Sequence, residues 1–197
     1  ISKHETEKGY DEVIKLLPQL IHEFPSLHYL LCGKSDINEK HRLASLIKKE
    51  NLEEHISLID FINEDELAAH YQLADTFILP SKKEGFGLVF IEAASCGCKT
   101  VSGNSDGSTD AMLNGALGIM VNPNNPDEIK KGIIKSLKQR HNHQTAWSSQ
   151  TKCLANFSHQ QYLQRTRYLL SKTLKNRQLC KIRNGQLNPA IISLIYH

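Results

Sequence analysis

Apolar residues recur along the first 140 residues with periods that alternate between those of helices and of strands. Residues 10–24 carry a stripe with a period of about 3.6, which predicts an amphipathic helix, and Pro18 inside it predicts a kink or an early end. Short apolar runs that end at turn residues predict strands at 27–33, 55–61, 74–80, 99–104 and 117–121, of which those at 27–33 and 74–80 are predicted to be buried. Further helices are predicted at 38–50, 64–73, 88–96, 107–113 and 126–140. This alternation is typical of an α/β fold, a Rossmann-like parallel sheet with flanking helices.

The segments after residue 140 carry a weaker pattern. Residues 159–178 predict a helix, and Asn184-Gly185 predicts a turn ahead of an apolar end. We therefore divide the chain into a Rossmann-like domain (1–140), a basic helical extension (141–178) and a tail without a predicted structure (179–197). A capping box is predicted at the start of the helix after Asn63, with Glu66 as its second member. The opening residues lack Met and read as a polar loop, so we expect the chain to begin inside a longer protein.

Charge is unevenly distributed along the 197 residues, whose net charge is +3. Residues 138–197 contain five Lys and five Arg and no acidic residue, while residues 1–137 carry a net charge of −7. This asymmetry indicates an anionic partner, such as an anionic membrane surface, or else a solvated basic face. Nucleic acid is not expected, because no RNA- or DNA-binding motif accompanies the basic residues. Five scattered cysteines favour reduced thiols, and His141 and His143 predict no metal site.

The loop 81–87 is the segment best suited to chemistry. It follows a predicted strand, and ligands of open α/β sheets bind at the carboxyl ends of strands. Gly85 and Gly87 allow a ligand to approach the backbone, and free amides at the start of the next helix attract phosphate. Glu84 and Glu92 can accept hydrogen bonds from sugar or ribose hydroxyls. A phosphate would need a cation, and Lys8 in the opening loop is the natural candidate.

Residues 74–101 closely resemble the donor-binding signature of retaining GT-B glycosyltransferases of group 1, which include glycogen synthases and mannosyltransferases. The hallmark of that family is a Glu-x7-Glu pair, which Glu84 and Glu92 match. The resemblance extends to segments 8–20, 60–75 and 103–123, and covers about residues 2–140 in the family's order. Two departures are that the usual Arg of the opening loop would fall just before Ile1, and that Asp110 stands where many members have Glu.

The resemblance implies a role for each matching residue. It implies that Glu84 holds a hydroxyl of the donor sugar and that Lys8 neutralises the diphosphate as the nucleotide leaves, so these two are the expected catalytic residues. It implies that Glu92 binds the ribose hydroxyls. The other residues expected to bind the donor, through the backbone or from nearby, are Gly33, Lys34, Phe61, Ile62, Gly85, Phe86, Gly87 and Leu88. It implies neither a metal nor a cofactor, since the nucleoside-diphosphate sugar, such as a UDP- or GDP-sugar, is the substrate.

The family has two Rossmann-like domains, and this chain resembles the C-terminal one. We therefore expect the donor-binding half of an enzyme that transfers a sugar to a glycan or lipid-linked acceptor, as in polysaccharide biosynthesis. The N-terminal acceptor domain is the expected partner, and the chain alone is expected to be inactive. The alternative is a non-catalytic nucleotide-sugar-binding subunit that needs a separate acceptor-binding chain. The expected location is the cytoplasm, or the inner face of a membrane as a peripheral protein.

Overall fold

The computed structural model describes residues 7–33 and 37–184, with backbone alone for 175–184. The chain divides into two compact units, Ile1–Leu154 and Ala155–His197. The boundaries at residues 140 and 178 were drawn on periodicity and stay predictions.

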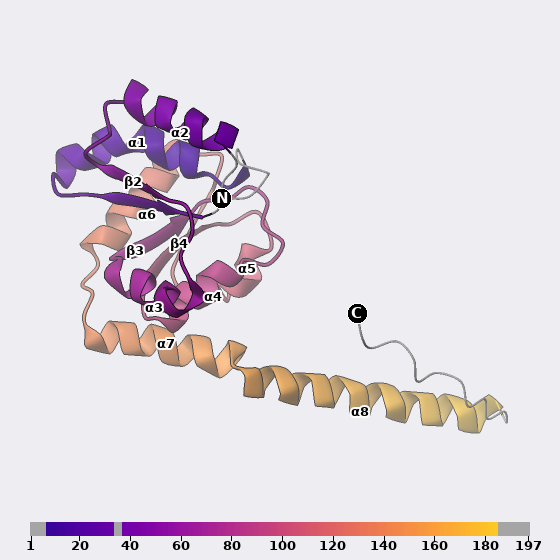
Figure 1. The fold of residues 1–197 in the computed structure, drawn as a ribbon. Helices are drawn as coiled ribbons and strands as arrows, with labels where there is room; N and C mark the ends of the chain where they lie inside the picture. The colour runs from indigo at the N-terminus through magenta and orange to yellow at the C-terminus, as the bar shows by residue number, and fades with distance from the viewer. Residues whose placement is uncertain (1–6, 34–36, 185–197) are drawn as a thin grey trace. The chain divides into compact units, whose positions relative to one another are not determined.

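Among the described residues, five short strands form the centre of the first unit, as Figure 1 illustrates. They are β1 (Tyr29–Cys32), β2 (Ile56–Ile59), β3 (Thr76–Leu79), β4 (Lys99–Gly103) and β5 (Ile119–Val121). All five lie inside the predicted runs, and every pairing is parallel. Hydrogen bonds join the strands as two sheets, β1-β2 and β3-β4-β5, where the pattern predicted one. The α/β class with parallel strands is confirmed.

The helices of the first unit follow the predicted alternation. Those that alternate with the strands are α1 (Tyr10–Glu23), α2 (Ile37–Lys49), α3 (Glu64–Leu73), α4 (Leu88–Ser95), α5 (Ser108–Ala111) and α6 (Pro126–Lys138). Helix α7 (His143–Phe157) comes after α6 without a strand between them, and its last residues belong to the second unit. Pro18 does not end α1, which continues to Glu23. The prediction of a capping box at α3 was wrong, because the Asn63 side chain makes no cap hydrogen bond. The backbone carbonyl of Asn63 accepts from the Glu66 N–H instead.

One hydrophobic core joins the two sheets. Leu31 of β1 and Val101 of β4 lie in the same buried cluster as Ile14 and Leu17 of α1 and Ile129 of α6. The prediction that the strand at 27–33 is buried was wrong in part. Successive strand residues point to opposite faces, so Leu31 enters the core while Leu30 and Cys32 are exposed.

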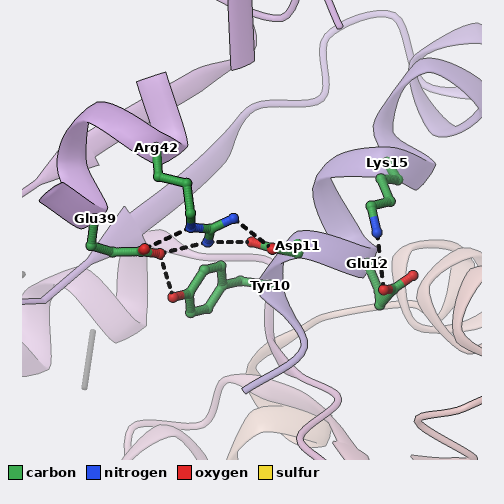
Figure 2. A network of polar contacts seen from close by, with 6 residues as sticks. All are labelled: Tyr10, Asp11, Glu12, Lys15, Glu39 and Arg42. Atoms are coloured by element: carbon green, nitrogen blue, oxygen red, sulfur yellow. Dashed lines mark hydrogen bonds and ion pairs between the residues drawn. The ribbon is translucent and has the colours of Figure 1, made fainter. Parts of the chain in front are cut away.

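A network of hydrogen bonds and ion pairs connects the start of α1 to α2 (Figure 2). Glu39 of α2 is only 2% exposed, and it accepts hydrogen bonds from the Tyr10 hydroxyl at 2.8 Å and from the Arg42 guanidinium at 2.6 Å. The same guanidinium donates to both carboxylate oxygens of Asp11 at 2.8 Å. Hydrogen bonds to Glu39 and Asp11 raise the pKa of Arg42, so its charge is retained. Because α1 follows directly on Lys8, this network also fixes the element that carries the opening loop.

Two helices lie in the region where the sequence pattern weakens. Helix α7 lies inside the predicted helical extension, but its bounds were not predicted because its residues are mostly polar. Cys153 is nevertheless buried, and the Gln150 amide donates to the Ser95 carbonyl at 2.6 Å. The helix predicted at 159–178 is confirmed as α8 (His159–Asn184), which continues six residues further. The turn at Asn184-Gly185 lies at the limit of the described residues. Nothing long and apolar enough to span a membrane occurs among the helices in the described ranges.

Candidate functional site

Lys8 and Glu84, which are 76 residues apart in sequence, meet at the carboxyl ends of the parallel strands. The Lys8 Nζ lies 2.5 Å from the Glu84 Oε2, and the two side chains are only 22% and 17% exposed. Glu84 belongs to the loop between β3 and α4. The backbone binds the two loops together as well, since the Lys82 N–H donates to the Glu7 carbonyl at 2.6 Å. The structure therefore brings the two expected catalytic residues into direct contact.

Glycines allow the backbones of three loops to pack closely beside this ion pair. Gly9 has a φ of 82°, and a Cβ there would lie 2.2 Å from the Pro80 carbonyl oxygen. A Cβ on Gly107 would lie 2.1 Å from the Gly85 carbonyl oxygen, while the Gly107 N–H donates to the Glu84 carbonyl at 3.0 Å. A larger residue at either glycine would have to displace backbone, so the position of Glu84 depends on both close approaches.

Glu92 lies in the second turn of α4, half-buried, and has a different partner. The Tyr71 hydroxyl of α3 donates to its Oε2 at 3.0 Å. Burial raises the pKa of Tyr71, and the nearby charge of Glu92 raises it further, so the phenol is a proton donor at neutral pH. The Tyr71 ring packs edge-on against Phe77, which packs edge-on against Phe90. These aromatic contacts position the Tyr71 hydroxyl that donates to Glu92.

The other expected donor-binding residues follow the carboxyl ends of β1, β2 and β3. Gly33 comes directly after β1 and its N–H donates to the Ile59 carbonyl at 2.9 Å, while Lys34 lies outside the described residues. Phe61, which follows β2, is 67% exposed, and Ile62 beside it is half-buried. At the start of α4, Gly85, Phe86 and Leu88 are exposed, and Gly87 is buried with a φ of 88°.

Two groups near the site were not singled out from the sequence. One is Tyr71, whose role depends on α3 and α4 packing together. The other is Asp106, which accepts hydrogen bonds from the Ser81 hydroxyl at 2.5 Å and from the Ser108 backbone N–H at 3.0 Å. Ser81 and Ser108 are fully buried, so this carboxylate joins the loop after β3 to the loop after β4. The Asp106-Gly107 turn signal was the only sequence feature that could have pointed to it.

The described residues contain no group of three or more His, Cys, Asp or Glu side chains placed to hold a metal ion. Free thiols are present at Cys32, Cys96, Cys98 and Cys153. Burial raises the pKa of Cys98 to about 11, so this thiol is protonated at neutral pH and is a poor nucleophile.

The parallel strands, their flanking helices and the glycine-rich loops at the strand ends define an α/β domain of the Rossmann-like class. Residues 1–153 match the family described as "Glycosyl transferases group 1". The chain belongs to this glycosyltransferase family.

Relatives and solved structures agree with this assignment. A GDP-mannose-dependent alpha-(1-6)-phosphatidylinositol monomannoside mannosyltransferase from Mycolicibacterium smegmatis is 30% identical over 141 residues, which are 68% of this chain and 36% of that protein. HepE from Anabaena, solved in complex with UDP, has the same fold with a TM-score of 0.74, 21% identity and coverage of 87% of this chain and 47% of that one. The C-terminal domain of LpcC, a group 1 glycosyl transferase from Francisella tularensis, has a TM-score of 0.65 at 20% identity and coverage of 77% and 80%.

The chain thus spans about a third of the length of the curated relatives that it matches. The structural neighbours are GT-B glycosyltransferases, which confirms the expected fold.

Proposed function

We propose that this chain is the donor-binding half of a retaining glycosyltransferase that takes a sugar from a nucleoside-diphosphate sugar. The observation that carries the proposal is the contact between Lys8 and Glu84 at the carboxyl ends of the strands. A cation that faces a carboxylate across a glycine-rich loop suits a ligand with one anionic and one hydroxyl-bearing end. The complex of HepE with UDP supports a nucleotide donor in this fold.

In this proposal Lys8 exchanges Glu84 for the diphosphate when the donor binds. Its ammonium group then neutralises the charge that develops on the leaving nucleotide, which is electrostatic stabilisation of the transition state. Glu84, released from Lys8, accepts a hydrogen bond from a hydroxyl of the donor sugar. No covalent role is assigned to Glu84, so the two-carboxylate scheme of glycoside hydrolases does not apply.

The remaining contacts to the donor are proposed for the backbone and for Glu92. The amides of Phe86, Gly87 and Leu88 precede or open α4, where the helix dipole favours the sugar-diphosphate. Glu92 would accept from the ribose hydroxyls while Tyr71 holds its other side. The segment of Phe61 and Ile62 would face the base, and Gly33 and Lys34 would lie near the nucleotide. No metal is required in this scheme.

The acceptor is proposed to be a glycan or a lipid-linked sugar, bound by an N-terminal acceptor domain. The likeness to the LpcC C-terminal domain, 80% of which is covered, supports a C-terminal position for this chain in the whole enzyme. The mannosyltransferase relative acts, by its name, on a phosphatidylinositol mannoside, which supports a lipid-linked acceptor. Without an acceptor domain we propose that the chain itself transfers no sugar. Its role would then be that of the donor site in polysaccharide biosynthesis.

Replacing Glu92 by Ala should weaken binding of the preferred nucleotide about tenfold, because one charge-assisted contact to the ribose is lost. Calorimetry with UDP, GDP and ADP identifies that nucleotide and measures the loss. Glu66→Ala, an exposed carboxylate on α3, is the matched control and should bind as the unaltered chain does. Equal affinity of the E92A and E66A variants would contradict the ribose contact.

The second unit is proposed to dock on an anionic membrane surface, which would make a cytoplasmic enzyme peripheral to the membrane. Arg165, Arg167 and Lys172 are exposed on α8 beside the exposed side chains of Leu169 and Leu170. Each removed cation should weaken binding to phosphatidylglycerol vesicles about fivefold, since a cation near such a surface contributes about 1 kcal/mol. Co-sedimentation of Arg167→Gln against Lys15→Gln, an exposed cation on α1, measures this. Indistinguishable sedimentation of the two variants would exclude docking through Arg167.

A further inference from the structure

A cavity lies in the first unit, at the opposite ends of the strands from Glu84. Its volume is about 480 Å³, and its walls include the residues that open β4 and β5. Strand β4 runs from Lys99 at this cavity to Gly103, which lies against Ser81 of the loop that carries Glu84. Because the strands are parallel, their amino ends share one edge and their carboxyl ends the other. The cavity is therefore separate from the proposed donor site.

The lining of this cavity is strongly basic. It contains the cations Lys99, Lys135, Arg140 and Lys152, with the imidazole of His141 beside them. No Asp or Glu is among the described residues that line it. Hydroxyl groups of Thr145, Ser148 and Ser149 complete the polar wall from α7, whose first turn includes Thr145. The positive end of that helix dipole adds to the four cations.

Backbone carbonyls hold two of the ammonium groups in the wall. The Lys99 Nζ donates to the carbonyls of Ser136 at 2.7 Å and Gln139 at 3.1 Å, which end α6. The Lys152 Nζ donates to the Ala116 carbonyl at 3.0 Å. Burial lowers the pKa of Lys99, and Asp75, which acts on Lys99 from outside the lining, opposes this only in part. The cavity thus brings four cationic side chains together, and backbone carbonyls orient the ammonium groups of Lys99 and Lys152.

We propose that this cavity is an anion site for a phosphate group, distinct from the nucleotide donor. Two kinds of group favour phosphate: ammonium groups supply charge, and the Arg140 guanidinium supplies paired N–H donors that match phosphate oxygens. The carrier of the phosphate is not a nucleoside, because His141 is the only ring among the described lining residues and no Trp, Tyr or Phe offers a stacking face. A sugar phosphate in solution and a phospholipid headgroup share the chemistry that the cavity recognises.

The test compares two pairs of charge-removing substitutions in the 197-residue chain. The variant K135Q/R140Q removes two exposed cations from the cavity wall without touching the carbonyl contacts of Lys99 and Lys152. The matched control K48Q/K49Q removes two exposed cations from the last turn of α2. Inorganic pyrophosphate is titrated at physiological salt, and backbone amide shifts of residues 97–100 and 115–118 are followed by NMR. These amides line the cavity and distinguish it from the donor site.

The expected result is saturable shifts of the 97–100 and 115–118 amides, with affinity about tenfold weaker in K135Q/R140Q and unchanged in K48Q/K49Q. Vesicles that contain phosphatidic acid, against phosphatidylcholine vesicles, form the second arm. Vesicle binding weakened only in K135Q/R140Q, without a pyrophosphate response, would support the site and assign it to a lipid headgroup. Equal responses of both variants to both probes, or no response in these amides together with no selective vesicle binding, would overturn the proposal.

Discussion

Replacing Arg42 by Ala is expected to lower the free energy of unfolding by about 3–5 kcal/mol, the largest effect on stability that we predict. The substitution removes the guanidinium that pairs the Glu39 carboxylate, which is buried from solvent. Asp11 loses both of its hydrogen bonds from Arg42 at the same time. The cost is large because the Glu39 carboxylate lies away from water and loses two charge-assisted hydrogen bonds from the guanidinium. Urea denaturation of the variant measures the loss.

Figure 2 contains the matched control for this experiment. Lys15 pairs with Glu12 at 3.2 Å on the exposed face of α1, so Lys15→Ala should change stability by no more than about 0.5 kcal/mol. The double variant E39M/R42M should recover most of the loss, since apolar side chains of similar size need no counter-charge. If R42A and K15A unfold at the same urea concentration, the network does not stabilise the contact between α1 and α2.

Replacing Lys8 by Met is expected to weaken binding of a nucleoside diphosphate about 100-fold. The reason is that the diphosphate loses its contact with the Lys8 ammonium group, which contributes about 3 kcal/mol. Met keeps most of the length of the Lys stem, so the change is mainly one of charge. Calorimetry with the nucleotide that binds best measures the effect. The corresponding nucleoside, which carries no phosphate, should bind the variant and the unaltered chain equally.

Lys83→Met is the control for Lys8, because Lys83 lies one residue from Glu84 but is 74% exposed. It pairs with Glu7 at 3.6 Å and should leave nucleotide binding within about twofold, as expected of an exposed pair. A loss that is the same for the nucleoside and the diphosphate would mean that Lys8 shapes the loops rather than contacts phosphate. A K8M variant that binds the diphosphate as K83M does would remove Lys8 from the site.

The sequence pattern predicted most elements of the fold for a local reason. Helix and strand periods extend over a few residues, so α1, α6 and all five strands were located from neighbouring positions alone. The bounds of helix α7 were not predicted because it contributes little apolar surface: Cys153 is its one buried residue among those described. The capping box at Asn63 was predicted wrongly for another reason. A spacing of three residues permits a capping box but does not decide the side-chain rotamer that forms it.

The loop 81–87 and its glycines located the candidate site in the sequence. The side-chain partners of its two glutamates were not predicted. Glu84 and Glu92 were selected by a spacing of eight positions, yet the nearest partner of each comes from elsewhere in the chain. The partner of Glu84 is Lys8, and that of Glu92 is Tyr71. Lys8 was predicted as the phosphate cation, but its direct pairing with Glu84 was not. The roles assigned to these residues toward a donor remain predictions that the nucleotide-binding experiments test.

The sequence by itself determined the order of the elements, the α/β class and the loop at 81–87, because hydrophobic periodicity and glycine conformations act between residues close in the chain. Only the tertiary structure decided which charges meet. The Lys8–Glu84 ion pair and the pairing of Arg42 with Asp11 depend on helices and loops packing at fixed distances. The same is true of the basic cavity, where Lys99 at the start of β4 lies with Arg140 and Lys152. Electrostatic energy depends on separation in space, and that separation exists only once the core of α1, β4 and α6 has formed.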